Sequence, residues 1–273
     1  MYNSLGIIIS DELIASELIK SLSIEYSGID IKILAEFGNI HRIKNIFLSN
    51  CSFVGVEEIL KTECLIILTD IGHIIDKIKS YNGNIIDFSG CLKNLCENVY
   101  DVYEPIRYIT NQLFLDSSRV SGNIYLPAAV FGKAGVEELL NQMKNVYNFV
   151  NNRESYLGVN LPFNVIFLDH CASDVIKNYV AYMRKEIPLT FSLRLIPVMT
   201  GLIADFFYNY NEEPDLSCVE LIDNCSDLIE LINEKKIFGI HNAENFTITI
   251  IADYIDVIVS QILNILKDEV FIK

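Results

Sequence analysis

The chain has 273 residues, of which 51% are hydrophobic and 21% are charged. This composition is typical of a folded globular protein and excludes a disordered chain. Thirty-six acidic residues against 21 basic ones give a net charge of −15. Because such a charge repels phosphate backbones, we expect no nucleic acid among the partners.

The chain has seven cysteines, which is an odd number. None of them forms a CxxC pair of the kind that zinc and redox sites use. A reducing compartment fits this pattern best, so we expect a cytoplasmic protein. The first twenty residues carry acids inside their apolar stretch and no basic leader, and no later run reaches about 18 uncharged apolar residues. We therefore expect neither a signal peptide nor a membrane span.

Apolar runs alternate with helical patterns in the first part of the chain. Buried strands that alternate with helices predict a parallel sheet with right-handed crossovers. The predicted strands are Leu5–Ile9, Ile31–Ala35, Cys64–Thr69 and Asn84–Phe88, and the predicted helices are Asp11–Leu22 and Ile74–Ser80.

The stretch from Tyr100 to Val120 has no clear period, and Ser121-Gly122-Asn123 punctuates it before the apolar run Ile124–Phe131. We expect this stretch to be irregular. Further along, periodicity predicts helices at 135–149, 174–185 and 255–267, and strands at 163–168, 191–199, 203–209 and 246–252.

The segment AAVFGKAGVEELLNQ, residues 128–142, resembles the stretch of aspartate-semialdehyde dehydrogenases that leads from the nicotinamide-side loop into the next helix. Other segments are similar to this family in the family's own order. They are Ile85–Ser89, Phe163–Ile166, Leu195–Val198 with Gly201, and Ile250–Asp253. The chain is shorter than a typical member between Tyr100 and Val120 and between Tyr210 and Phe246.

This resemblance implies an α/β fold with two domains. Residues 1–123 would form a Rossmann-like parallel-sheet domain, completed by a C-terminal helix at 253–273. Residues 124–252 would form an α+β dimerisation domain of the semialdehyde dehydrogenase type. Since the family dimerises through the sheet of this second domain, a homodimer is expected, with an active paralogue as the alternative partner.

The nucleotide loop of the family is degenerate in this chain. A dinucleotide site needs glycines at its first turn, so that backbone N–H groups can approach the pyrophosphate. The three glycine positions are occupied here by Ile9, Glu12 and Ala15. Glu12 places a carboxylate where phosphate would sit, and can instead stabilise the helix dipole by about 0.3–1 kcal/mol. Glu36 is either a ribose ligand or, more commonly, a solvated loop residue.

The catalytic residues of the family have no counterpart either. No cysteine lies between Cys96 and Cys171, and Ser117 and Ser118 have no neighbouring histidine to activate them. Leu202 stands where the family has its acid–base histidine, and leucine cannot transfer a proton. We therefore expect no catalytic residue and no bound cofactor, with NADP possible only if the chain is an altered enzyme.

Some polar positions of the family's substrate side are retained. The substrate-clamping arginine falls on Leu195, and Arg194, one residue earlier, should point to the opposite sheet face as a surface or interface charge. Lys93, Asp174 and Lys177 could form a residual anion pocket. The competing interpretation is that Asp174 and Lys177 are an ordinary exposed pair on a helix.

Metal and phosphate motifs are not expected. The four histidines lie far apart, and only Asp169-His170 places a carboxylate beside an imidazole, so no metal site is predicted. Gly132-Lys133 lacks the glycine spacing of a P-loop. The histidines are His41, His73, His170 and His241.

The sequence thus predicts a non-catalytic homologue of aspartate-semialdehyde dehydrogenase that acts as a dimeric interaction or regulatory protein. The alternative is an NAD(P)-dependent semialdehyde dehydrogenase-like enzyme, or a small-anion binding protein, with altered chemistry.

Overall fold

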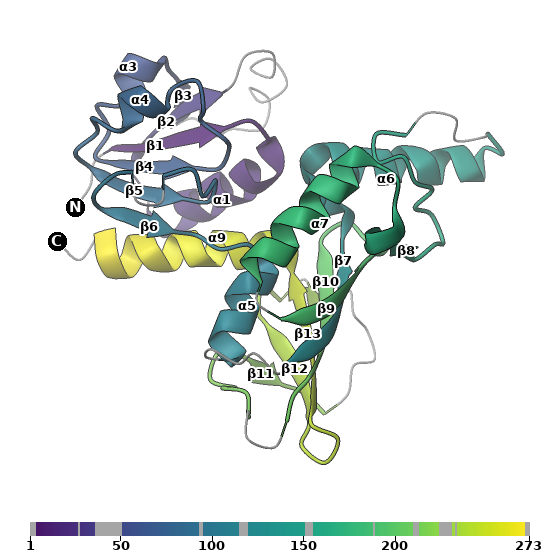
Figure 1. The fold of residues 1–273 in the computed structure, drawn as a ribbon. Coiled ribbons are helices and arrows are strands. Elements are labelled where there is room, and N and C mark those ends of the chain that lie inside the picture. Colours follow the sequence, from purple (N-terminus) through teal and green to yellow (C-terminus); the bar gives the residue numbers. More distant parts are fainter. Residues whose placement is uncertain are drawn as a thin grey trace. The chain divides into compact units, whose positions relative to one another are not determined.

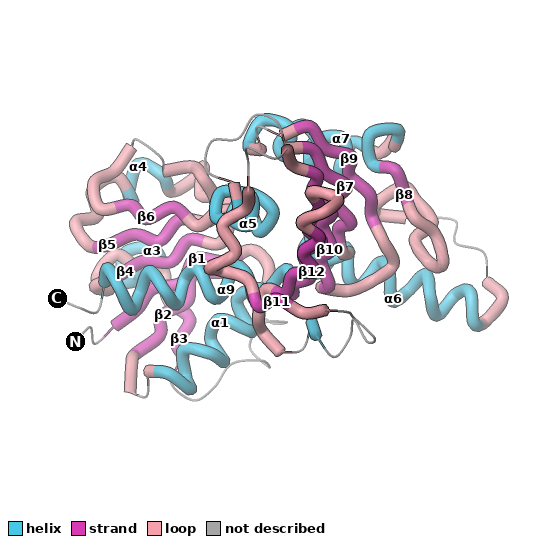
Figure 2. The backbone as a smooth tube through the Cα atoms, turned by 90° about the horizontal axis from the view of Figure 1, so that it is seen from below, coloured by secondary structure: helices cyan, strands magenta, loops and turns pink. Residues whose placement is uncertain are grey.

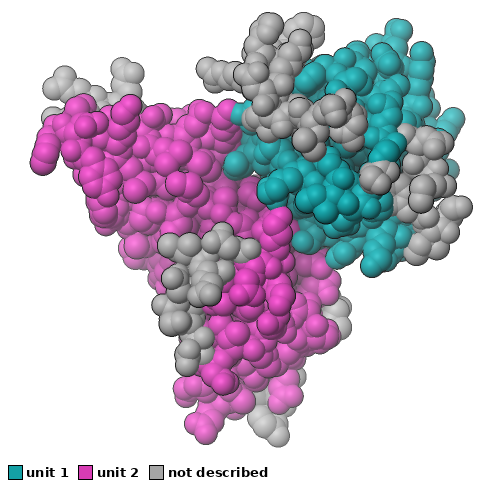
Figure 3. All heavy atoms as spheres, turned by 180° about the vertical axis from the view of Figure 1, so that it is seen from behind, with its two compact units in different colours: residues 1–104, 258–273 teal, residues 105–257 magenta. Residues whose placement is uncertain are grey.

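The computed structural model describes residues 4–26, 28–35, 51–92, 95–114, 120–150, 155–187, 189–209, 213–223, 231–232 and 234–270. The chain divides into two compact units (Figure 3). Unit 1 comprises Met1–Glu104 with Ile258–Lys273, and unit 2 comprises Pro105–Val257.

Unit 1 contains a six-stranded sheet in the order β3-β2-β1-β4-β5-β6, in which every pairing is parallel (Figure 1). This is the strand order of doubly wound dinucleotide-binding folds. The strands are β1 Ser4–Ile9, β2 Asp30–Ala35, β3 Cys51–Phe53, β4 Cys64–Ile67, β5 Asn84–Asp87 and β6 Val99–Asp101. The predicted parallel sheet is confirmed.

Both faces of this sheet are apolar, because its strands alternate their side chains between two helix-covered sides. Ile8, Leu65 and Ile85 pack in one cluster with residues of α3 (Val56–Ile59) and α4 (Ile75–Ile78). The remaining helices of the unit are α1 (Glu12–Glu25) and the part of α9 (Tyr254–Ile265) from residue 258, which continues into a π-helical turn at Leu266–Val270.

Unit 2 contains a seven-stranded mixed sheet in the order β11-β12-β13-β10-β7-β9-β8 (Figure 2). The pairs β7–β9 and β11–β12 are parallel, and the other neighbours are antiparallel. The strands are β7 Ser121–Leu126, β8 Ile166–Phe167, β9 Thr190–Leu195, β10 Gly201–Phe207, β11 Glu220–Leu221, β12 Phe238–Asn242 and β13 Thr247–Asp253.

One face of the unit 2 sheet forms the core with the helices of that unit. Buried side chains of β7, β9, β10 and β13 pack there with residues of α5, α6 and α7. The helical elements are α5 Pro105–Leu113, η1 Ala128–Phe131, α6 Gly132–Tyr147, η2 Leu168–His170 and α7 Asp174–Glu186. The alternate residues of the same strands face the other side of the sheet.

The region from Tyr100 to Val120, expected to be irregular, begins in β6 and contains helix α5. That expectation was wrong, because Pro105 is the first residue of α5 and Ile106, Ile109 and Leu113 follow at helical spacing. These three side chains belong to the unit 2 core. The contact boundary therefore falls at Glu104, one helix earlier than residue 123.

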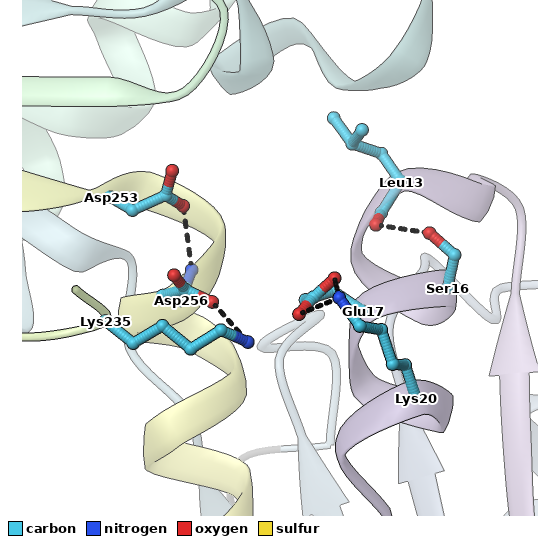
Figure 4. A network of polar contacts seen from close by, with 7 residues as sticks. All are labelled: Leu13, Ser16, Glu17, Lys20, Lys235, Asp253 and Asp256. Carbon is cyan, nitrogen blue, oxygen red and sulfur yellow. Dashed lines mark hydrogen bonds and ion pairs between the residues drawn. The ribbon is translucent and has the colours of Figure 1, made fainter. Parts of the chain in front are cut away.

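Ser121-Gly122-Asn123, interpreted from the sequence as punctuation, is the start of β7. Gly122 lies here because a Cβ at this position would be 2.9 Å from the backbone oxygen of Asp205 on β10. The glycine thus permits two strands to approach and does not mark a turn. Asp253 caps α9 by accepting from the N–H group of Ile255. It also accepts from the N–H group of Asp256 (Figure 4).

Within the described part of the chain, no helix is long and apolar enough to cross a membrane.

Candidate functional site

The candidate site of unit 1 lies at the carboxyl ends of β1 and β4, where the strand order reverses. In doubly wound sheets, ligands bind in the crevice outside this switch point. Ser10 follows β1 and Thr69 follows β4 closely, and the Thr69 hydroxyl donates to Ser10 Oγ at 2.7 Å. The two strand ends are therefore joined by a side-chain hydrogen bond.

The N-terminus of α1 begins at this switch point and is capped from within the chain. Asp11 has an extended backbone, with φ −122° and ψ 135°, and its Oδ1 accepts from the backbone N–H of Leu13 at 2.7 Å. This is an ordinary N-cap, in which a side-chain oxygen pairs with an N–H group that the helix leaves open. In a dinucleotide site the N–H groups at such a helix end face the pyrophosphate. In this chain a carboxylate pairs with one of them.

The three positions that replace the family's glycines are structural. Ile9 ends β1 and is fully buried, and Ala15 is fully buried in α1. Glu12 is the first residue of α1 and is 7% exposed. Together with Asp11, it places two carboxylates at the helix end. This arrangement does not fit a nucleotide pyrophosphate, since it adds negative charge at the helix end and occupies one of the backbone donors there.

The ends of the next strands are also acidic. Asp70, after β4, accepts from the N–H of Gly72 at 2.9 Å. Asp87, at the end of β5, is 1% exposed and accepts from Ser89 N, Ser89 Oγ and Leu92 N at 2.8, 2.6 and 3.0 Å. Its carboxylate holds the loop after β5 and is satisfied by it. Asp87 was not predicted to have this role, although an Asp-x-Ser sequence after a strand is a signal for such a turn.

Leu202, the residue that the sequence resemblance aligns with an acid–base histidine, lies in the core of unit 2. Leu202 is fully buried in β10, where it pairs with Ala252 of β13, and Leu195 is fully buried in β9. Both belong to the cluster that packs against the helices. An imidazole at residue 202 would therefore be enclosed by apolar side chains.

The shifted cysteine pKa values run against a thiolate nucleophile, which requires a low pKa. Burial raises the pKa of the Cys64 thiol to about 12. Burial also raises the pKa of Cys96, although Lys79 acts against it, and burial raises the pKa of Cys218. Ser117, Ser118 and Cys225 lie outside the described residues.

The described histidines do not assemble a site. His73 and His170 are exposed, and Asp169 pairs with Arg184 at 2.5 Å. His241 Nε2 lies 2.5 Å from the hydroxyl of Tyr208, whose pKa is raised by burial and then by Glu213. Within the ranges described above, no three metal-ligating side chains come together. Glu36 and His41 lie outside those ranges.

Solved structures with this architecture include aspartate-semialdehyde dehydrogenases. The enzyme II of Vibrio cholerae, complexed with ASA, aligns over 99% of this chain and 100% of its own, with a TM-score of 0.73 and 12% identity. A probable enzyme from Pseudomonas aeruginosa aligns over 98% of this chain and 99% of its own, with a TM-score of 0.72 and 11% identity. The Candida albicans enzyme with NADP has a TM-score of 0.62 and 8% identity, over 98% of this chain and 99% of its own.

The chain has the aspartate-semialdehyde dehydrogenase fold. This confirms the fold that the resemblance implied. No family model and no curated protein sequence matches the chain. With identities of 8 to 12%, the agreement concerns the fold alone.

The structure describes two of the three residues of the predicted residual anion pocket, Asp174 and Lys177. Lys177 Nζ lies 3.4 Å from Asp174 Oδ1, and these side chains are 57% and 92% exposed. They form an exposed ion pair three residues apart on α7, which contributes little to stability. Lys93, the third predicted member, lies outside the described residues.

The face of the unit 2 sheet that points away from its core carries polar and aromatic side chains of intermediate exposure. We call it the open face and define it by Asn123, Tyr125, Ser192, Arg194, Ile203, Asp205 and Thr249. Three cross-strand hydrogen bonds order it: Ser192 to Asn123 at 2.8 Å, Arg194 to Tyr125 at 3.0 Å, and Thr249 to Asp205 at 2.7 Å.

Arg194 lies on this open face, whereas Leu195 lies in the core. Its guanidinium carbon is 5.1 Å from the ring centre of Tyr125 and 5.2 Å from that of Phe167. Cation–π contact with two rings fixes the position of this charge. The predicted orientation, opposite to Leu195, agrees with these contacts.

Proposed function

We propose that this chain is a non-catalytic protein with the aspartate-semialdehyde dehydrogenase fold, which acts in the cytoplasm as a dimeric interaction or regulatory protein. The observation that carries the proposal is the closed N-terminus of α1. Asp11 pairs with Leu13 N at 2.7 Å and Glu12 is 7% exposed, at the place where a dinucleotide fold presents donors to phosphate. Carboxylates at this helix end oppose phosphate charge, and the cap by Asp11 stabilises the helix.

The second unit supports the same proposal. A leucine, Leu202, fills a core position where the family has a histidine, so the acid–base group has been replaced by packing. A well-packed sheet with a leucine at this position supports a role that depends on the shape or the surface of the unit. The open face is the part of that surface that the helices of unit 2 leave uncovered.

Dimerisation through the open face follows from this surface. The face extends over β9, β7, β10 and β13, and Phe167 and Phe207 beside it are 54% and 43% exposed. Exposed aromatic side chains with ordered polar groups between them are typical of interface cores. We expect a homodimer, with an active paralogue as the alternative partner.

Two measurements on the purified chain test the proposal. Sedimentation equilibrium at micromolar concentration should give the mass of a dimer, and a monomer that also recovers no paralogue from native lysate would refute it. Thermal unfolding with NADP or NAD should show no shift. A nucleotide present at a hundred times its dissociation constant would stabilise the fold by about 2.7 kcal/mol, which is readily seen.

The alternative, an altered enzyme or a small-anion binding protein, is less well supported because Asp174 and Lys177 are exposed. The same thermal assay with phosphate and aspartate derivatives separates it from the proposal. A concentration-dependent shift with either compound, abolished by Lys177→Ala, would favour the alternative.

A further inference from the structure

We infer that the C-terminal end of α6 binds a lipid surface, by inserting exposed aromatic side chains into the headgroup region of a zwitterionic membrane. We call this part of the surface the α6 tip and define it by Val146, Tyr147, Phe149 and Val150, all of which are exposed. The inference goes beyond the proposed function and does not depend on the dimer. It concerns a peripheral contact, which needs no membrane-spanning helix.

Phe149 occupies a backbone position that glycine usually fills. It follows the last turn of α6 with a φ of 56°. Its N–H group donates to the oxygen of Val146 at 3.1 Å, and the N–H group of Val150 donates to the oxygen of Asn145 at 2.8 Å. These two bonds form a Schellman motif, in which the left-handed residue is usually glycine because a Cβ is strained there. The phenylalanine is therefore not the residue that best ends this helix.

The ring of Phe149 points into solvent, since the residue is 98% exposed. Phe246 provides the contrast. It is also left-handed, with a φ of 52°, but its ring lies edge-on to Tyr208 with the ring centres 6.0 Å apart. A contact within the unit thus offsets the strain at Phe246, whereas Phe149 combines a strained backbone with an exposed ring. This combination indicates a contact outside the chain.

The other apolar side chains of the tip also face outward. After a Schellman turn, the following apolar residue usually packs back against the last turn of the helix. The residues available for such packing in α6 are Lys144 and Asn145, and Val150 stays exposed. Tyr147 is exposed as well, so the tip forms one apolar patch with Phe149.

The middle of α6 is fastened to unit 2, and the tip lies beyond this attachment. Gln142 is 2% exposed, and its side-chain amide donates to the oxygen of Val159 at 2.9 Å and accepts from the N–H group of Leu161 at 2.7 Å. Figures 1 and 2 both place the end of α6 at the margin of unit 2, away from its sheet. A helix end held in this way presents its side chains to a flat surface.

The charge around the tip suits lipid headgroups. The chain has a net charge of −15, yet the sequence from Leu139 to Val150 contains no acidic residue and one charged residue, Lys144. Lys144 can extend towards a headgroup phosphate while its aliphatic part follows the apolar surface. Tyr147, three residues later on the same side of the helix, adds an aromatic ring with a polar hydroxyl, as is common at membrane interfaces. Because the chain as a whole repels negative charge, a zwitterionic surface suits it better than an anionic one.

Tryptophan fluorescence tests insertion directly, because the chain contains no tryptophan. With phosphatidylcholine vesicles, the emission of Phe149→Trp should move to shorter wavelength and be quenched by brominated acyl chains. Phe163→Trp is the matched control, since Phe163 is also left-handed, with a φ of 61°, and 73% exposed, but lies just before β8. Its emission should not change. An equal response of both variants, or none from Phe149→Trp, would overturn the inference.

Phe149→Gly separates binding from folding. Glycine removes the ring and suits the left-handed backbone, so the midpoint of urea unfolding should not fall. Co-sedimentation with phosphatidylcholine vesicles should show a partition at least about tenfold weaker than that of the wild type. An unchanged partition would contradict insertion of the ring, and a lower midpoint would show that Phe149 serves the fold instead.

Two further outcomes decide the nature of the surface that the tip binds. Vesicles that contain phosphatidylserine should bind less protein, because of the net charge of −15, and stronger binding to them would overturn the zwitterionic assignment. A shift of the Phe149→Trp emission that needs no vesicles and grows with protein concentration would assign the tip to a protein contact, and would overturn the lipid inference. Neither result bears on the proposed function, which is tested by sedimentation and nucleotide binding.

Discussion

The carboxylate of Asp11 accepts a hydrogen bond from the backbone N–H of Leu13 at 2.7 Å, at the point where β1 leads into α1. The carboxylate of Asp11 thus places a negative charge at the N-terminus of α1. The bond has consequences for stability that do not depend on any ligand.

Asp11→Ala removes the N-cap of α1, and should lower the free energy of unfolding by about 1 kcal/mol. Asp11→Asn keeps a capping oxygen and should cost a few tenths of that amount. Urea unfolding followed by circular dichroism measures both values. Equal losses for the two variants would show that the hydrogen bond to Leu13 contributes nothing to stability.

Leu202→His introduces the residue type that the sequence resemblance implies for active enzymes of this fold, but should not create activity. The side chain at residue 202 is fully buried among apolar neighbours, so an imidazole there has neither solvent nor a designed partner. We expect a loss of about 3 kcal/mol from lost packing and unpaired polar atoms. Leu202→Met, which conserves volume, should cost less than about 1.5 kcal/mol. Full stability of the histidine variant would contradict this account.

Gly135→Ala tests whether α6 requires a glycine at residue 135 for its close approach to Ala128. A Cβ at residue 135 would lie 2.3 Å from the backbone oxygen of Ala128, which cannot move away as a side chain can. Alanine improves helix propensity by at most about 1 kcal/mol. The overlap should outweigh it and destabilise the protein by about 1–3 kcal/mol.

Gly72→Ala is the control for this variant, since its Cβ would meet only the side chain of Asp70, at 3.5 Å. Its effect on thermal unfolding should be small. A Gly135→Ala variant as stable as Gly72→Ala would refute the close approach of Ala128.

The local sequence predicted the strands of the fold better than it predicted the contacts of individual side chains. The strands of unit 1 were predictable because burial on both faces produces continuous apolar runs such as Leu5–Ile9. Gly122 was misinterpreted, because a glycine required by a neighbouring strand looks in sequence like one required by a turn. The contacts of Arg194 with Tyr125 and Phe167 depend on strand order in unit 2, which no local pattern contains.

The degenerate nucleotide loop at Ile9, Glu12 and Ala15 stays a prediction from the sequence, whereas the N-cap at Asp11 was not identified. The predicted helix began at Asp11, yet an aspartate directly before an apolar period is a signal for the N-cap position. The predicted start of the helix differs from the observed start by one residue, and this difference decides whether Asp11 is a helical residue or the N-cap. The backbone angles of the boundary residue set such a helix start, and here Asp11 is extended. The neighbouring sequence determines these angles only weakly.

Cys64 should make stability fall at alkaline pH. Burial raises the pKa of its thiol from 9.0 to about 12, so the folded state holds the proton more tightly than the unfolded chain does. The contribution to stability is fully present below pH 9 and is lost as the pH rises from 9 towards 12. Within that window the free energy of unfolding should fall by up to about 1.4 kcal/mol per pH unit.

Cys64→Ala, measured by urea unfolding between pH 8 and pH 10.5, should lose this part of the pH dependence, because it has no thiol to ionise. Cys91→Ala removes a thiol that is only partly buried, and serves as the control for the loss of a cysteine side chain. A pH slope in Cys64→Ala equal to that of wild type would show that the Cys64 thiol ionises as readily in the folded protein as in the unfolded chain.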